Sequence, residues 1–250
     1  MRVRFPSLAP NEYDSQMAVL FLLFLYNKSM NYQELEKHLF KISDQKFAAF
    51  SKSLSNSDYI SIGVKTPILR SIVKERTKDE ELKLDDFTLG KYLEVDFIYF
   101  SLALARLKDI DSQLSFLKEN ISKAKSWVIT DTVPTYLKKL TFEKFWPFFL
   151  ENNNSPYIFS RRMSYILALK LYKDKRVLDT LPYIKKDEDY MVMMAEAWFM
   201  ATAATLYEDE IFTYLSKCED MVLKRKTISK ICDSFRFNET SKNRFKSLRQ

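Results

Sequence analysis

The chain has 250 residues, enough to bury a large core in one extended domain or two ordinary ones. It carries a formal net charge of +7 but only two glycines, Gly63 and Gly90. Because sheets, hairpins and phosphate-binding loops all depend on glycine, this scarcity excludes a Gly-rich nucleotide loop and predicts an all-α protein. A single histidine, His38, and two cysteines without CxxC spacing exclude a His-dependent triad, and we expect neither metal nor cofactor.

The first predicted element is an apolar run, Met17–Tyr26, which is too short to span a bilayer. Glu12 and Asp14 precede this run and no small-residue cleavage site follows it. We therefore predict a buried helix within an N-terminal helical extension, residues 1–30, rather than a signal peptide or a membrane anchor.

From residue 31 onward, apolar residues recur at helical spacing, as in Leu35, Leu39 and Phe40. Short polar stretches interrupt the pattern near residues 27–31, 55–61, 76–84, 108–111, 120–122, 152–156, 173–175, 185–189 and 218–220. The pattern predicts about a dozen helices in one unit, residues 31–250, stacked in pairs as an α-α superhelix. Such a solenoid has a concave face that suits an extended ligand such as a duplex.

Near the middle of the chain, Trp127 and Asp131 stand four residues apart in a helical stretch, which places both on one face. An anion beside an electron-rich ring favours a cation or a transition state that develops positive charge. The alternative is structural: Trp127 would be a core aromatic, and Asp131 would cap a segment that restarts at Pro134. The local sequence leaves both open.

The positive charge is concentrated at the C-terminal end, where residues 217–250 hold ten basic and four acidic side chains. This cluster indicates a polyanionic partner, most simply nucleic acid, although a solvated basic helix would have the same composition.

Five segments, taken in chain order, resemble the motifs of one family: Gly63–Arg70, Ser126–Leu137, Ser155–Arg162, Asp189–Trp198 and Ile228–Arg236. The family is that of the bacterial DNA alkylation repair enzymes, the AlkD-like HEAT-repeat DNA glycosylases. The resemblance covers roughly residues 33 to 249 and implies a HEAT-like solenoid with a concave basic groove.

The resemblance also implies roles for particular residues. Asp131 would be the catalytic carboxylate, with Trp127 and Trp198 flanking the damaged nucleotide and Arg162 holding phosphate nearby. Tyr190 is assigned to substrate binding, and the residues expected on the DNA backbone are Arg161, Lys224, Arg225, Lys230 and Arg236. Such enzymes release N3- and N7-alkylated purines, whose positive charge makes them good leaving groups, so a carboxylate and aromatic faces suffice as catalysts.

Some positions depart from the family pattern. The stretch from Asp131 to Pro134 is one residue shorter, Met194 replaces a basic residue, and Glu196 replaces a small one. The alternative to a glycosylase is therefore a non-catalytic relative that binds DNA or serves as a protein scaffold. We expect a cytoplasmic monomer that contacts the backbone of double-stranded DNA without reading sequence, and no membrane.

Overall fold

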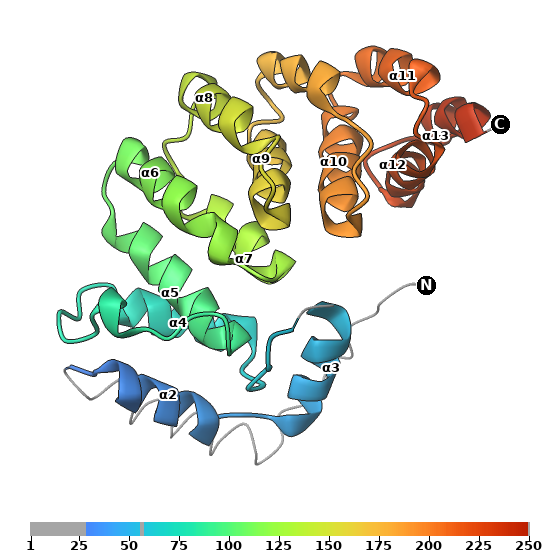
Figure 1. Ribbon diagram of the computed structural model, residues 1–250. Coiled ribbons are helices and arrows are strands. Elements are labelled where there is room, and N and C mark those ends of the chain that lie inside the picture. Colours follow the sequence, from blue (N-terminus) through green and yellow to red (C-terminus); the bar gives the residue numbers. More distant parts are fainter. Residues whose placement is uncertain (1–28, 56–57, 250) are drawn as a thin grey trace. The chain divides into compact units, whose positions relative to one another are not determined.

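The computed structural model describes residues 29–55 and 58–249 (Figure 1). These residues form helices and no strand, which confirms the all-α prediction; one isolated parallel β-bridge joins Ile60 and Tyr92. Among the described residues, no helix is long and apolar enough to cross a membrane. Nearly all of the predicted N-terminal extension, including the run Met17–Tyr26, lies outside the described residues.

The α-helices are α2 (Tyr32–Lys41), α3 (Gln45–Ser55), α4 (Thr66–Arg76), α5 (Leu93–Arg106), α6 (Ile110–Asn120), α7 (Trp127–Thr132), α8 (Phe142–Asn152), α9 (Ile158–Lys170), α10 (Tyr190–Ala203), α11 (Glu208–Lys217), α12 (Met221–Asp233) and α13 (Glu239–Lys246). Short 3-10 helices lie at Leu84–Asp86, Ile121–Lys123, Val133–Thr135, Lys175–Tyr183 and Ser247–Arg249.

Contacts between residues divide the chain into two compact units, Met1–Leu102 and Ala103–Gln250, with the boundary inside α5. The sequence predicted one unit from residue 31 to the end, because no long linker marks a division. Each unit buries apolar side chains of its own, such as Leu35 in the first and Phe199 in the second.

In the first unit, the turn before α4 is fixed by a buried carboxylate. Glu94 accepts hydrogen bonds from the backbone N–H groups of Ile62, Gly63 and Val64 at 2.9, 2.8 and 3.2 Å. Gly63 has φ of +99°, and a Cβ there would lie 2.2 Å from the carbonyl oxygen of Asp44. Only glycine fits this position, which explains the glycine at the start of the first resembling segment.

In the second unit, helices that are near neighbours in the chain pack on one another. Helix α6 packs on α8, α8 on α9, α9 on α10, and α10 on α12 (Figure 1). This succession is the packing of a helical-repeat array, in which each layer buries the next. The short helix α7 packs against α9.

Helices α9 and α10 lie at the centre of this unit, and most of their residues are buried. A helix that is buried on most sides leaves few positions at which a polar side chain is tolerated without a partner. Two charged side chains on these helices, Arg162 and Glu196, are buried, so the groups that surround them are informative about function and stability.

Candidate active site

The site begins with α7, a helix of only six residues that carries Trp127 and Asp131. Ser126, fully buried, caps it by accepting a hydrogen bond from the N–H of Val128 at 3.3 Å. Asp131 lies inside the helix and its carboxylate faces a side chain from another helix, so the alternative in which Asp131 caps a following segment is wrong. Trp127 is half-buried, one turn before Asp131.

Asp131 is held in a two-point ion pair with Arg162 of α9. Arg162 Nη2 lies 2.8 and 2.9 Å from the two carboxylate oxygens, and Nε lies 3.1 Å from Oδ1. Nε also donates to the hydroxyl of Thr130 at 3.0 Å, and Nη1 donates to the carbonyl of Met191 on α10. The planar fork of the guanidinium thus ties α7, α9 and α10 together around one carboxylate.

The Arg162 side chain is only 6% exposed, whereas the Asp131 side chain retains 17% exposure. Burial raises the pKa of the Asp131 carboxyl, and the Arg162 guanidinium, the Thr130 hydroxyl and the Lys230 ammonium oppose that rise. Because arginine stays protonated, the two-point pair holds Asp131 as a carboxylate. Of the two side chains, Asp131 is the one that solvent or a ligand can reach.

Lys230 of α12 extends the site. Burial lowers the pKa of its ammonium, the charge of Arg162 adds to that effect, and the charge of Asp131 opposes it. The Lys230 ammonium also lies 5.9 Å from the centre of the Trp198 ring, within cation–π range. Lys230 thus links the Asp131 carboxylate to the aromatic face on α10.

Two aromatic side chains on α10 are open to solvent. Trp198 is 41% exposed and Tyr190 is 50% exposed, whereas most residues of this helix are buried. The ammonium of Lys226 lies 5.5 Å from the centre of the Tyr190 ring. Each exposed ring is thus paired with a lysine of α12, an arrangement of flat apolar faces and cations that suits nucleic acid.

The residues expected on the DNA backbone do not share one environment. Arg225 and Arg236 are exposed, but Lys224 is only 8% exposed. Arg161 donates to Asp187 at 2.7 and 3.1 Å and to the carbonyl of Ser155 at 2.9 Å. Lys224, Arg161 and the buried Arg162 are therefore committed to the protein interior or to internal partners, and Arg225, Lys230 and Arg236 remain the best placed for phosphate.

Glu196 does not join the exposed face of α10. Glu196 is 2% exposed. Its carboxyl group is hydrogen-bonded to the Tyr165 hydroxyl, but the Oε2 atom has no hydrogen-bond partner of its own. Burial, together with the charge of Asp187, raises the pKa of Glu196 to about 8. The acid at this position therefore leaves the exposed face unchanged and bears on stability instead.

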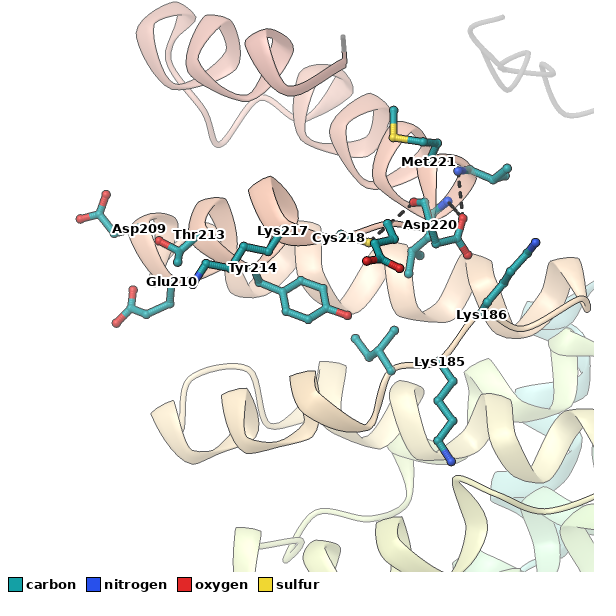
Figure 2. Close-up of a pocket in the computed structure, with 14 residues that line it drawn as sticks. Lys185, Lys186, Asp209, Glu210, Thr213, Tyr214, Lys217, Cys218, Asp220 and Met221 are labelled. Carbon is teal, nitrogen blue, oxygen red and sulfur yellow. Dashed lines mark hydrogen bonds between the residues drawn. The ribbon is translucent and has the colours of Figure 1, made fainter.

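A large cavity of about 1170 Å³ is separate from these residues. It lies among residues 184–186, α11 and the start of α12, where Asp220 caps α12 (Figure 2). None of the predicted site residues lines it. A smaller cavity of about 500 Å³ does include Trp198, Lys230 and Arg236. Among the described residues, no cluster of three or more His, Cys, Asp or Glu side chains could hold a metal.

A family model described as DNA alkylation repair enzyme matches residues 35–232. The chain belongs to this family. Its members are enzymes of DNA alkylation repair, which implies DNA as the substrate. Among curated proteins, no relative matches the chain.

One solved structure similar to this member of the family is a predicted DNA alkylation repair enzyme from Enterococcus faecalis. The two share 14% identity and a TM-score of 0.62, and the alignment covers 77% of this chain and 98% of that one. At this identity the likeness establishes the fold alone.

Sequence reasoning missed three groups that complete the site: the Thr130 hydroxyl, the Met191 carbonyl and Lys226. Thr130 directly precedes Asp131, and a hydroxyl residue next to a candidate acid was a signal that the sequence carried. The Met191 carbonyl left no trace in the sequence, because any residue supplies the same backbone oxygen.

Proposed function

We propose that this alkylation repair enzyme is a DNA N-glycosylase that releases cationic N3- and N7-alkylated purines, with Asp131 as the catalytic carboxylate. The observation that carries the proposal is the pairing of Asp131 with Arg162: a partly exposed carboxylate whose orientation is fixed from three helices. In many enzymes, polar groups that are already oriented toward the charge that develops in the transition state make the largest single contribution to the rate enhancement.

In the proposed reaction, the bond between the sugar C1′ and the alkylated purine breaks, and its electron pair leaves with the base. The positive base becomes neutral, so no general acid is needed, and the sugar becomes an oxocarbenium-like cation. The Asp131 carboxylate stabilises that cation, and a water molecule then adds to C1′ and loses a proton.

The hydrogen bonds around Asp131 suit both tasks. Oδ1 accepts from Arg162 Nε and Nη2, whereas Oδ2 accepts from Nη2. A carboxylate oxygen can accept a second hydrogen bond, so Oδ2 has the capacity to orient the attacking water. Arg162 acts as a positioning residue, and Trp127 and Trp198 supply aromatic faces for a nucleotide.

The test is release of 7-methylguanine and 3-methyladenine from methylated duplex by the wild type and by Asp131→Asn. Asparagine keeps the size and removes the charge, so the rate should fall on the order of a hundredfold or more. Duplex affinity should stay the same or rise slightly, because an anion near phosphate is lost. Exposed Asp179→Asn, in the segment before α10, is the control and should keep the wild-type rate.

A wild-type protein that binds methylated duplex but releases no base above the spontaneous rate would reject the glycosylase. The alternative, a non-catalytic DNA-binding relative, would then account for the exposed aromatic rings and lysines of α10 and α12.

A further inference from the structure

The cavity of about 1170 Å³ is a groove that follows one face of α11 and takes no part in the site around Asp131. The α11 residues that line it are Asp209, Glu210, Thr213, Tyr214 and Lys217. They recur about every four residues, so they share one face of the helix, and eight residues of helix rise about 12 Å. Residues 184–186 and the start of α12 complete the walls of this α11 groove (Figure 2). The groove is long enough for a short peptide segment.

The floor of the α11 groove is apolar. Ile184, Tyr214 and Met221 line it and are half-buried, and Val222 lines it with 55% of its surface exposed. Apolar side chains that lie together and open to solvent in the free protein mark a surface that another molecule covers. The floor therefore suits the apolar side chains of a partner.

Three of the acidic side chains on the groove walls have partners inside the protein. Asp209 pairs with Arg244 at 2.7 Å, and Glu210 pairs with Lys175 at 2.6 Å. Asp220 accepts hydrogen bonds from two backbone N–H groups and so caps α12. These carboxylates therefore add little negative charge to the groove.

The lysines of the groove are exposed and carry charge that is not neutralised in this way. Lys186 and Lys217 form no ion pair within the described part of the chain, and Lys185 donates one hydrogen bond to the amide oxygen of Asn154 at 3.0 Å. Glu219 is the lining acid that remains against these three cations. The rim of the groove is therefore net positive.

The α11 groove lies on the opposite side of α10 from the exposed aromatic face. Glu196 precedes Trp198 by two residues, which corresponds to about 200° around the helix. Burial is the main cause of the raised pKa of the Tyr214 hydroxyl, and the charge of Glu196 adds to it, so Glu196 lies on the α11 side of α10. A ligand in the groove would therefore leave Trp198 accessible to DNA.

We infer that the α11 groove binds an acidic amphipathic segment of a protein partner. Its apolar side chains would cover Val222 and the rest of the floor, and its carboxylates would pair with Lys186 and Lys217. Charge complementarity selects this occupant, because the rim would repel a basic peptide and a phosphate backbone has no apolar side chains for the floor. The inference does not depend on the reaction at Asp131.

The test is the anisotropy of a labelled synthetic peptide of about a dozen residues, with acidic and apolar residues on opposite faces of a helix. The full chain should bind this peptide with micromolar affinity. A peptide with lysines in place of the acids, or serines in place of the apolar residues, should bind about tenfold more weakly or not at all, because each loses half of the match. Saturating duplex DNA should not displace the acidic peptide.

Lys186→Glu and Val222→Asp change exposed positions, so folding is not at risk. Each should weaken peptide binding about tenfold, through like-charge repulsion at the rim or a charge on the apolar floor, and should keep the duplex affinity and the excision rate. The matched controls are Val222→Leu, which keeps the floor apolar, and Lys139→Glu, at an exposed lysine outside the groove. Both should bind the peptide like the wild type.

Equal affinity for the acidic and the lysine-substituted peptides, or an affinity that survives both groove variants, would overturn the inference. Displacement of the peptide by duplex would overturn it by assigning the groove to DNA, and self-association that Val222→Asp abolishes would do so by assigning it to a second copy of the chain. A wild type that binds the peptide as expected but releases no alkylated base would support the groove and reject the proposed function alone.

Discussion

In the Asp131–Arg162 pair, the arginine is buried and its guanidinium is bonded within the protein. The resemblance assigned Arg162 to phosphate, yet each arm of its guanidinium is directed to Asp131, Thr130 or Met191 within the protein. A side chain that is 6% exposed offers little charge to a phosphate. Its effect on catalysis would pass through the orientation of the carboxylate.

We therefore expect Arg162→Lys to lower the excision rate by up to about a hundredfold while the salt dependence of duplex binding stays unchanged. Lysine keeps the charge but loses the planar fork, so the carboxylate is no longer held in one orientation. Single-turnover excision and binding at several salt concentrations provide the two measurements.

The neighbouring Arg161→Lys is the control, because Arg161 also pairs with a carboxylate, Asp187, but not with Asp131. It should keep most of the excision rate. If Arg162→Lys instead reduced the slope of log duplex affinity against log salt by about one, Arg162 would contact phosphate and the positioning role would be rejected.

Glu196 makes a separate prediction about pH. Its pKa is about 8 in the folded protein against 4.5 for a free glutamate, with burial as the main cause. Between these values the unfolded chain ionises Glu196 while the folded protein keeps it protonated, so stability should fall as pH rises from about 5 to 8. The free energy of unfolding should fall by at most about 1.4 kcal/mol per pH unit in this range.

Glu196→Gln should remove this slope, because an amide does not titrate, and urea unfolding at several pH values measures it. The exposed Glu239→Gln should leave the slope as it is in the wild type. A variant at position 196 that kept the full slope would show that another group causes it.

At the level of helices, local sequence predicted some starts and stops, but the breaks at residues 42–44, 204–207 and 234–238 were not predicted. Asp109, Asp189 and Asp220 each stand in a predicted polar break and each caps the helix that follows. The irregular stretch from Val133 to Thr141 was not predicted, because its 3-10 turn is embedded among apolar residues that continue a helical pattern. The ion pair between residues 131 and 162 joins separate helices, so no local pattern could reveal it.

Helix caps give a prediction that separates stability from function. Asp189 accepts a hydrogen bond from the N–H of Met191 at 2.8 Å, and the Met191 carbonyl in turn accepts from Arg162. Asp189→Ala should cost about 1 kcal/mol of stability and also slow excision, because the first turn of α10 would fray beside Arg162.

Asp109→Ala removes an equivalent cap on α6, where Asp109 accepts from Ser112 N–H at 2.8 Å. We expect a similar loss of stability by denaturant unfolding with no change in the excision rate. Equal effects of both variants on excision would mean that overall stability, and not the start of α10, limits activity.

Over the whole chain, the net charge of +7 predicts a duplex affinity that falls steeply with salt, through release of counterions from the DNA. Composition did not distinguish exposed basic residues from buried ones. The helical period does so in α12, where Lys224 lies four and seven residues before the buried Ile228 and Ile231 and so belongs to the inward stripe. Arg225, one residue on, is exposed.

Arg225→Ala should therefore weaken binding to all duplex sequences alike and reduce the slope of log affinity against log salt by about one. Lys224→Ala should leave that slope unchanged and lower the stability instead, because its aliphatic stem is packed in the core. Anisotropy of a labelled duplex across a salt series, with urea unfolding of both variants, measures the two effects. If Lys224→Ala lowered the slope as much as Arg225→Ala, the ammonium of Lys224 would reach the DNA despite its burial, and the whole of α12 would count as phosphate-binding surface.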